Sequence, residues 1–155
     1  MLAVLDEIEA CLHGDHFLAA LQLSLTVPEI AAALASETGR GGEGGYRAWF
    51  DAHLKPLYPS LGAEDCLSLR LGLAPKDRRV LFTVPSAQGD AFHNEVFNGA
   101  LNLDTPTFCR DVSRAARAWL EAEAGNPTVA RNLERALRPR PAGLDPFMVG
   151  VPLIA

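Results

Sequence analysis

The sequence has few features that announce a reaction. Its three cysteines, Cys11, Cys66 and Cys109, lie far apart and form no CxxC pair, which excludes a zinc knuckle and a dithiol redox motif. A P-loop GK[ST], a GxSxG elbow, an HExxH pair and an acidic calcium loop are all missing. The chain therefore lacks the marks of the nucleotide hydrolases, serine hydrolases, zinc peptidases and calcium-binding proteins that carry those motifs.

Long apolar runs and targeting signals are also lacking. The longest apolar run, Phe17 to Leu34, is interrupted by Gln22, Pro28 and Glu29, so we do not expect it to span a membrane. A signal peptide is not recognisable, and with the unpaired cysteines this predicts a cytoplasmic location. We expect each cysteine to be a small buried hydrophobe rather than a nucleophile.

What is present is an ordinary globular composition. The chain has 155 residues, of which 48% are hydrophobic and 21% charged, with a net charge of −5. This length fits one domain with one substantial core. The acidic total argues against a protein that coats nucleic acid, whose surface would be basic. The segment 104–155 nevertheless holds seven arginines against six acids, so a local basic strip is possible there.

Apolar residues at helical spacing predict helices in the first half of the chain. One runs from Leu2 to Leu12, and a second, capped by Asp15, continues through Leu25. The stretch 26–29 has capping-box spacing with proline in the first turn, which predicts a third, short helix. The apolar stripe in 46–57 predicts a fourth.

A glycine-rich segment separates the third and fourth of these helices. Gly39, Gly41 and Gly44 match G-x-G-x-x-G, but the dinucleotide-binding fingerprint requires a preceding strand, and here a helix precedes it. We therefore expect a flexible connection between helices.

The second half of the chain mixes strand and helix signals. Residues 80–84 are β-prone and residues 95–103 could pair with them as a small β-hairpin, although Asn98-Gly99 is itself a turn signal. A helix then begins at Asp104 or Thr105 and ends before Gly125, and a last one begins at Asn126. The predicted fold is mainly α: a single-domain helical bundle of about six or seven helices, with the hairpin inserted between the Arg70 helix and the helix at 105–124.

The tail, residues 139–155, is apolar but interrupted by glycine and proline. Such a tail is too apolar to remain in water, so we expect it to pack irregularly on the bundle or on a dimer partner.

Arg70 is the most unusual residue of the chain. It lies among leucines in a helix that Gly72 and Pro75 end. A buried guanidinium without a partner costs several kcal/mol, so Arg70 either pairs with Glu64, Asp65 or a carboxylate on another helix, or acts in a site.

Three histidines and two arginine rows complete the candidates. His93, beside Asn94 in a loop, is a possible catalytic residue, whereas His13 and His16 lack further metal ligands, so no metal site is expected. The spacing of two sets of arginines places each set on one helix face, which could bind phosphate or, alternatively, be a solvated face paired with Asp111, Glu121 and Glu134. These sets are Arg110, Arg114 and Arg117, and Arg131, Arg135 and Arg138.

The segment 64–75 around Arg70, preceded by residues 46–50 and followed by 80–84, His93-Asn94 and 104–119, resembles a group of uncharacterised bacterial helical proteins. These are in turn similar to HEPN-type domains, helical bundles that commonly dimerise and often act as metal-independent ribonucleases through an R-x4–6-H motif. The resemblance places the motif arginine at Arg70. The expected histidine is replaced, because residues 75–77 are Pro, Lys and Asp.

The resemblance therefore implies a degenerate module that binds RNA, a nucleotide or a partner protein without cleaving and without a cofactor. A second hypothesis is a structural homodimer formed through the apolar tail and the aromatic stripe within residues 46–57. A third is a ribonuclease in which His93 replaces the lost base beside Arg70.

Overall fold

The computed structural model describes residues 1–75, 77, 79–86 and 92–155, and the chain is mainly α, as predicted. Six helices lie in this part of the chain: α1 (Leu2–His13), α2 (Phe17–Ala35), α3 (Glu43–His53), α4 (Ala63–Arg70), α5 (Thr105–Ala122) and α6 (Pro127–Glu134). The strands are β1 (Val80–Thr83), β2 (Glu95–Phe97), β3 (Ala100–Asp104), β4 (Pro139–Arg140), β5 (Gly143–Leu144), β6 (Met148–Val149) and β7 (Leu153–Ile154).

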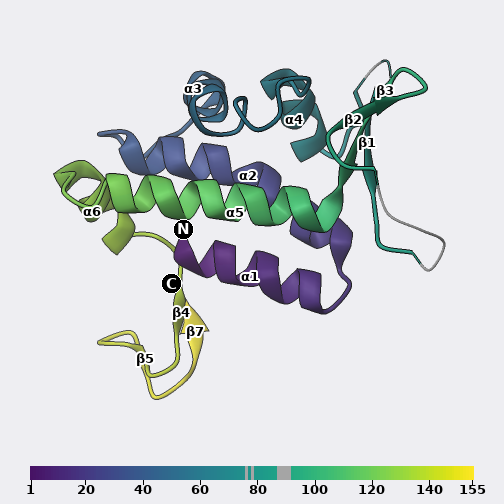
Figure 1. Ribbon diagram of the computed structural model, residues 1–155. Helices are drawn as coiled ribbons and strands as arrows, with labels where there is room; N and C mark the ends of the chain where they lie inside the picture. The colour runs from purple at the N-terminus through teal and green to yellow at the C-terminus, as the bar shows by residue number, and fades with distance from the viewer. Residues whose placement is uncertain (76, 78, 87–91) are drawn as a thin grey trace.

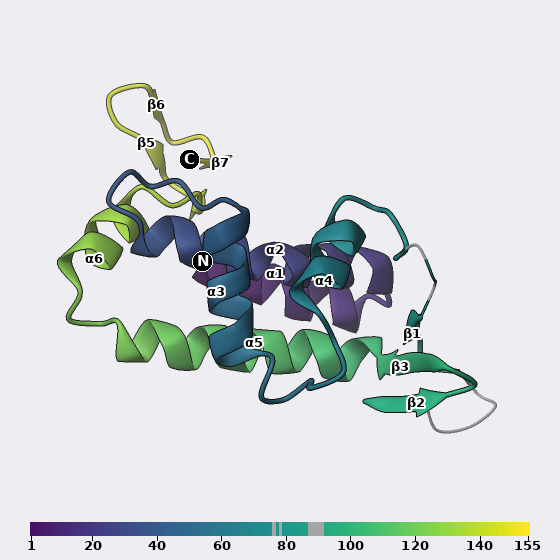
Figure 2. The ribbon, with the colours of Figure 1, turned by 90° about the horizontal axis from the view of Figure 1, so that it is seen from above.

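Helix α2 is the centre of the structure. It contacts each of the other five helices, with α3 and α4 on one side, and α1 and α5 on the other, as Figures 1 and 2 show. Ala20, Leu25 and Ala31 of α2 are fully buried. By length and composition α2 is also the one helix of the described residues that could cross a membrane, a test that core helices of soluble proteins pass as well.

The structure has one helix over residues 17–35 where the sequence predicts two. Pro28 lacks the N–H that would bond the Ser24 carbonyl. The hydroxyl of Thr26, two residues before the proline, bonds the backbone of the same helix: its Oγ1 donates to the Leu23 carbonyl at 2.7 Å. Val27 and Pro28 are both buried, so tertiary packing keeps the helix continuous through the proline. The predicted cap at Asp15 is also wrong, because this residue has a left-handed φ of 57° and makes no cap hydrogen bond.

The glycine-rich segment packs closely on α2 instead of forming a loose connection. A Cβ on Gly41 would lie 2.7 Å from the Glu29 carbonyl oxygen, and one on Gly45 would lie 2.7 Å from the Ala32 Cβ. Real Cβ contacts are essentially never that short. The two glycines therefore let the start of α3 approach α2.

The predicted hairpin between residues 80–84 and 95–103 is wrong, although a different hairpin lies in this segment. Strands β2 and β3 form the hairpin, with Asn98 and Gly99 at positive φ in its turn. Strand β1 is a third strand and pairs with β3 in parallel, in the order β1-β3-β2. The Asn-Gly turn interrupts the stretch 95–103, so it cannot serve as one continuous partner strand. The loop predicted at 86–90 lies largely outside the described residues.

The predicted caps of α5 and α6 are confirmed. The Asp104 carboxylate accepts a hydrogen bond from the Thr107 N–H at 3.0 Å, and the Asn126 side chain accepts from the Thr128 N–H at 3.0 Å. Each cap is followed by a proline in the first turn, where the missing N–H has no intrahelical partner to lose.

Residues 139–155 form what we term the C-terminal arm. It consists of two short antiparallel pairs, β4 with β7 and β5 with β6, so it is not irregular as predicted. Figure 1 shows it extending away from the helices, rather than packed on them. Packing of the arm on a partner stays a prediction. Its exposed large apolar residues are Phe147, Met148, Val149, Val151 and Ile154.

Candidate functional site

Arg70, at the C-terminal end of α4, connects three helices. Its Nη1 donates to Glu29 Oε2 on α2, and its guanidinium carbon lies 5.8 Å from the centre of the Tyr46 ring on α3. The side chain of Arg70 is only 23% exposed, so water screens this pair less than it screens a surface pair. The carboxylate on another helix that the sequence predicts as a partner of Arg70 is thus Glu29. These contacts indicate a structural role for Arg70.

Other contacts hold α4 in the same position. Gln22 Nε2 on α2 donates to the Leu69 carbonyl at 3.0 Å, and Arg47 on α3 pairs with Glu64 at the start of α4. Burial raises the pKa of Tyr46 far above its ordinary value, so the phenol beside Arg70 stays protonated. These contacts hold α4 in place, while Arg70 Nε and Tyr46 Oη are buried without a hydrogen-bond partner among the described residues.

His93 belongs to a separate hydrogen-bonded chain at the start of α5. The Asp104 N–H donates to His93 Nδ1 at 3.1 Å, which leaves the ring proton on Nε2. His93 Nε2 lies 3.3 Å from Tyr58 Oη, and Tyr58 donates to Asp111 Oδ2 at 2.8 Å. Burial, followed by the hydrogen bond to Asp111, raises the pKa of Tyr58 far above its ordinary value.

This chain of hydrogen bonds does not prepare His93 to act as a base. A neutral histidine has one nitrogen lone pair for accepting a proton, and here that lone pair receives the Asp104 N–H. The hydrogen bonds of Arg70 go to Glu29, and those of His93 go to Asp104 and Tyr58. Within one chain the structure therefore places the two predicted catalytic residues in different networks.

The arginines of α5 are paired with carboxylates of the same chain. Arg117 Nη2 lies 2.9 Å from an Asp6 oxygen, and Arg110 Nη2 lies 3.4 Å from a Glu9 oxygen, both on α1. Arg114 pairs with Asp111 at 3.0 Å. Of the carboxylates that the solvated-face alternative suggested, Asp111 does pair with an arginine of this row. The other two arginines of the row pair with carboxylates of α1.

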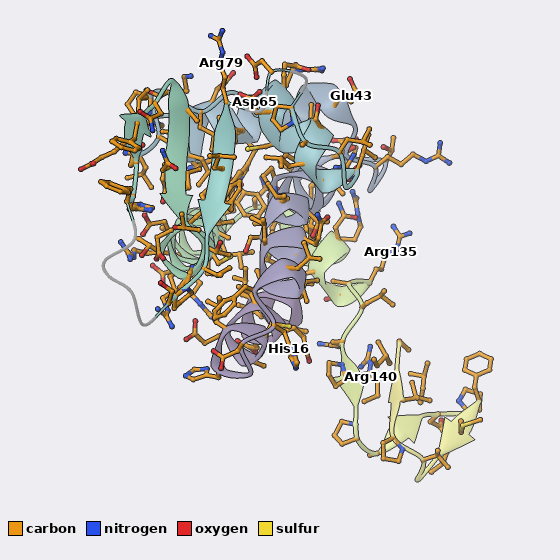
Figure 3. All side chains as sticks on the ribbon, turned by 90° about the vertical axis from the view of Figure 1, so that its right-hand side faces the viewer. His16, Glu43, Asp65, Arg79, Arg135 and Arg140 are labelled. Atoms are coloured by element: carbon orange, nitrogen blue, oxygen red, sulfur yellow. The ribbon has the colours of Figure 1, made fainter. Side chains whose placement is uncertain are left out.

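The arginines at and after α6 do not continue this row. Arg131 donates to the Glu37 carbonyl beyond the end of α2 at 3.3 Å. Arg138 pairs through its backbone with Ala155 at the root of the arm. Arg135 is exposed and lies near Gly39, and Figure 3 shows it above the arm that carries Arg140. The two predicted rows thus have different surroundings.

The sequence did not predict a groove that lies where the arm leaves the helices. We term this cavity of about 310 Å³ the root groove. Its residues come from α1, α2, the loop after α2, and the α6 region, so only the folded chain brings them together. They are Met1, Val4, Ile30, Ala33, Leu34, Gly39, Asn132, Arg135, Ala136 and Leu137.

Asn132 is the polar residue that stands out in the root groove. Its side chain is 6% exposed, and its Nδ2 donates to the carbonyls of Ala33, Leu34 and Ser36, which satisfies the C-terminal end of α2. These three acceptors fix the orientation of the amide. The opposite atom, Oδ1, is buried and has no hydrogen-bond partner among the residues that the structure describes. A buried acceptor of this kind costs about 1–3 kcal/mol if it stays unpaired.

Metal-binding and thiol chemistry have little support in the described residues. No group of three or more His, Cys, Asp or Glu residues there could hold a metal ion. Burial raises the pKa of Cys66, and it raises the pKa of Cys109 to about 11. Both thiols are therefore protonated at neutral pH, and both are free.

Comparisons with protein-family models, with curated proteins and with solved structures give no match for this chain.

Proposed function

We propose that the chain is a single-domain helical bundle that serves as an interaction module and self-associates through its C-terminal arm. This develops the homodimer hypothesis with the apolar tail alone, because Tyr46, Trp49 and Phe50 of the aromatic stripe are buried within the chain. The proposal includes no catalytic reaction, because Arg70 is engaged with Glu29 and the His93 lone pair is engaged with the Asp104 N–H.

The exposure of the arm is the observation that supports this proposal. Phe147 is 82% exposed and Ile154 is 74% exposed, although both belong among the residues that proteins normally bury. Isolated two-stranded ladders are only marginally stable in water, so a surface that covers the arm would stabilise its two strand pairs. Large exposed apolar surface is typical of protein interfaces.

Binding of RNA or a nucleotide, which the resemblance implies, also stays a proposal, with less support. Three of the six arginines that would form the strip already pair with carboxylates. A phosphate ligand would have to compete with those carboxylates. The ribonuclease hypothesis would additionally require Arg70 and His93 to meet across two chains.

Light scattering on arm variants tests self-association. We expect Phe147→Ser together with Ile154→Ser to shift a dimer to monomer at micromolar concentration, because both side chains lose the apolar surface that the interface buries. Leu18 and Leu71, 72% and 69% exposed on other elements, provide the matched control, in which Leu18→Ser with Leu71→Ser keeps the dimer. A dimer that persists in the arm variant would refute the role of the arm.

A further inference from the structure

We infer that the root groove of one copy takes the arm tip (residues 144–150) of a second copy, in a reciprocal exchange about a two-fold axis. This inference rests on the proposed self-association and adds which surfaces meet. In the exchange, Phe147 fills the apolar groove, its N–H donates to Asn132 Oδ1, and Asp145 pairs with Arg135. Exchange of an identical element is a low-cost route to a closed dimer.

The hydrogen-bonding state of Asn132 indicates what kind of ligand the groove takes. The three carbonyls at the end of α2 hold Nδ2, so the buried Oδ1 can serve only as an acceptor. Asn132 is one of the residues that line the groove, and the other lining side chains are mainly aliphatic. A ligand that is apolar and carries one N–H donor therefore fits, and a polypeptide segment with a large apolar side chain is such a ligand.

Charge complementarity points to a second copy of this chain. Arg135 has the only charged side chain among the residues that line the groove, and it pairs with no carboxylate in the part of the chain that the structure describes. Between residues 141 and 155, Asp145 has the only charged side chain, and it likewise lacks an ion-pair partner among the described residues. Asp145 lies two positions before Phe147, so both can reach one groove.

The apolar area of the whole arm, tip and flanking residues together, reaches the lower end of what a stable dimer needs. Burying a large apolar side chain gains about 1.5–3 kcal/mol at about 25 cal/mol per Å², which corresponds to roughly 60–120 Å² each. The five exposed apolar residues of the arm are between 49% and 82% exposed, so one whole arm offers roughly 300 Å². Phe147, Met148 and Val149 belong to the tip, and the second copy would cover Val151 and Ile154 beside the groove. Two arms and the two surfaces that they cover would lose roughly 1,200 Å², at the lower end for stable interfaces.

The position of the groove makes the exchange feasible. Leu137 and Ala136 line the groove and immediately precede the arm. A second cavity of about 180 Å³ continues the groove along Met1, Leu133 and Arg138 toward the root of the arm. Two copies related by a two-fold axis near this root would each place their tip close to the other's groove.

A pair of charge-reversed chains tests the inference. Arg135→Glu and Asp145→Arg each put like charges together at both contacts of a homodimer, and we expect each variant alone to dimerise about tenfold more weakly, about 1.4 kcal/mol. Mixing the two variants restores wild-type affinity, because each groove of the heterodimer then faces the opposite charge. Arg79→Glu and Asp51→Arg, on other elements, are the matched controls, and their mixture behaves like the separate chains.

Sedimentation equilibrium with one labelled chain separates the outcomes. A wild-type chain that stays monomeric refutes the self-association itself. A wild-type dimer that Arg135→Glu and Asp145→Arg leave unchanged overturns the groove inference, while self-association stands. Restoration only when both substitutions are in one chain, and not in the mixture, shows that an arm contacts its own groove, which also overturns the exchange.

Discussion

Replacing Arg70 with methionine tests whether this arginine is structural. The substitution keeps an unbranched side chain but removes the ion pair with Glu29 and the contact with the Tyr46 ring. An exposed ion pair contributes about 0.2–1 kcal/mol and breaking a fully buried one costs about 3–5 kcal/mol. Arg70 is 23% exposed and Glu29 is 37% exposed, which places this pair between the two limits.

The contact with the aromatic ring adds about 0.5–1 kcal/mol. We therefore expect Arg70→Met to lower the free energy of unfolding by about 2 kcal/mol, and the Tm by about 4–8 °C for a chain of this size. Urea unfolding followed through the fluorescence of Trp49 and Trp119, both largely buried, measures the change.

A double-mutant cycle with Glu29→Gln isolates the pair. We expect a coupling energy of about 1 kcal/mol between positions 29 and 70. Arg114→Met is the control, because Arg114 is 77% exposed and its removal should change stability by less than about 0.5 kcal/mol. Additive effects of the two substitutions, or an Arg70→Met chain as stable as the wild type, would refute the structural role.

Three further predictions concern side chains inside the protein. Asn132→Ala leaves the carbonyls at the end of α2 unpaired and should lower the free energy of unfolding in urea by about 2 kcal/mol; an unchanged value would contradict the cap. A thiol reagent at neutral pH should label Cys11 quickly and the buried Cys66 and Cys109 only on unfolding, whereas three fast thiols would contradict the packing. Because the pKa of Tyr58 is raised in the folded chain, its stabilisation is present below the unfolded value of about 10 and is lost as pH rises above it. Tyr58→Phe should therefore weaken the alkaline loss of stability, and an unchanged pH profile would contradict this.

The features predictable from the sequence are those set by neighbouring residues. Asp104 and Asn126 cap their helices as expected, because a cap depends only on a side chain and the N–H groups two or three positions later. The mainly α class follows from the helical spacing of apolar residues over most of the chain. The Asn98-Gly99 turn is also predictable, because this dipeptide favours the positive φ values of a tight hairpin turn.

The features that the sequence did not predict depend on distant contacts. The continuous α2 requires packing around Pro28 that no local pattern shows. The parallel pairing of β1 with β3 joins strands that are about 20 residues apart. Glu29 is 41 positions from Arg70, so its identity as the partner could not be read from spacing. The root groove is formed by three segments that are far apart in the sequence. The apolar tail alone indicated an interface near it.

The measurement that tests the central claim most directly is the mass of the unmodified chain by sedimentation equilibrium across a wide micromolar range of concentration. Self-association through the arm predicts a mass that rises with concentration to that of two chains and then stays there, since a reciprocal exchange is closed. A mass of one chain throughout would contradict the account.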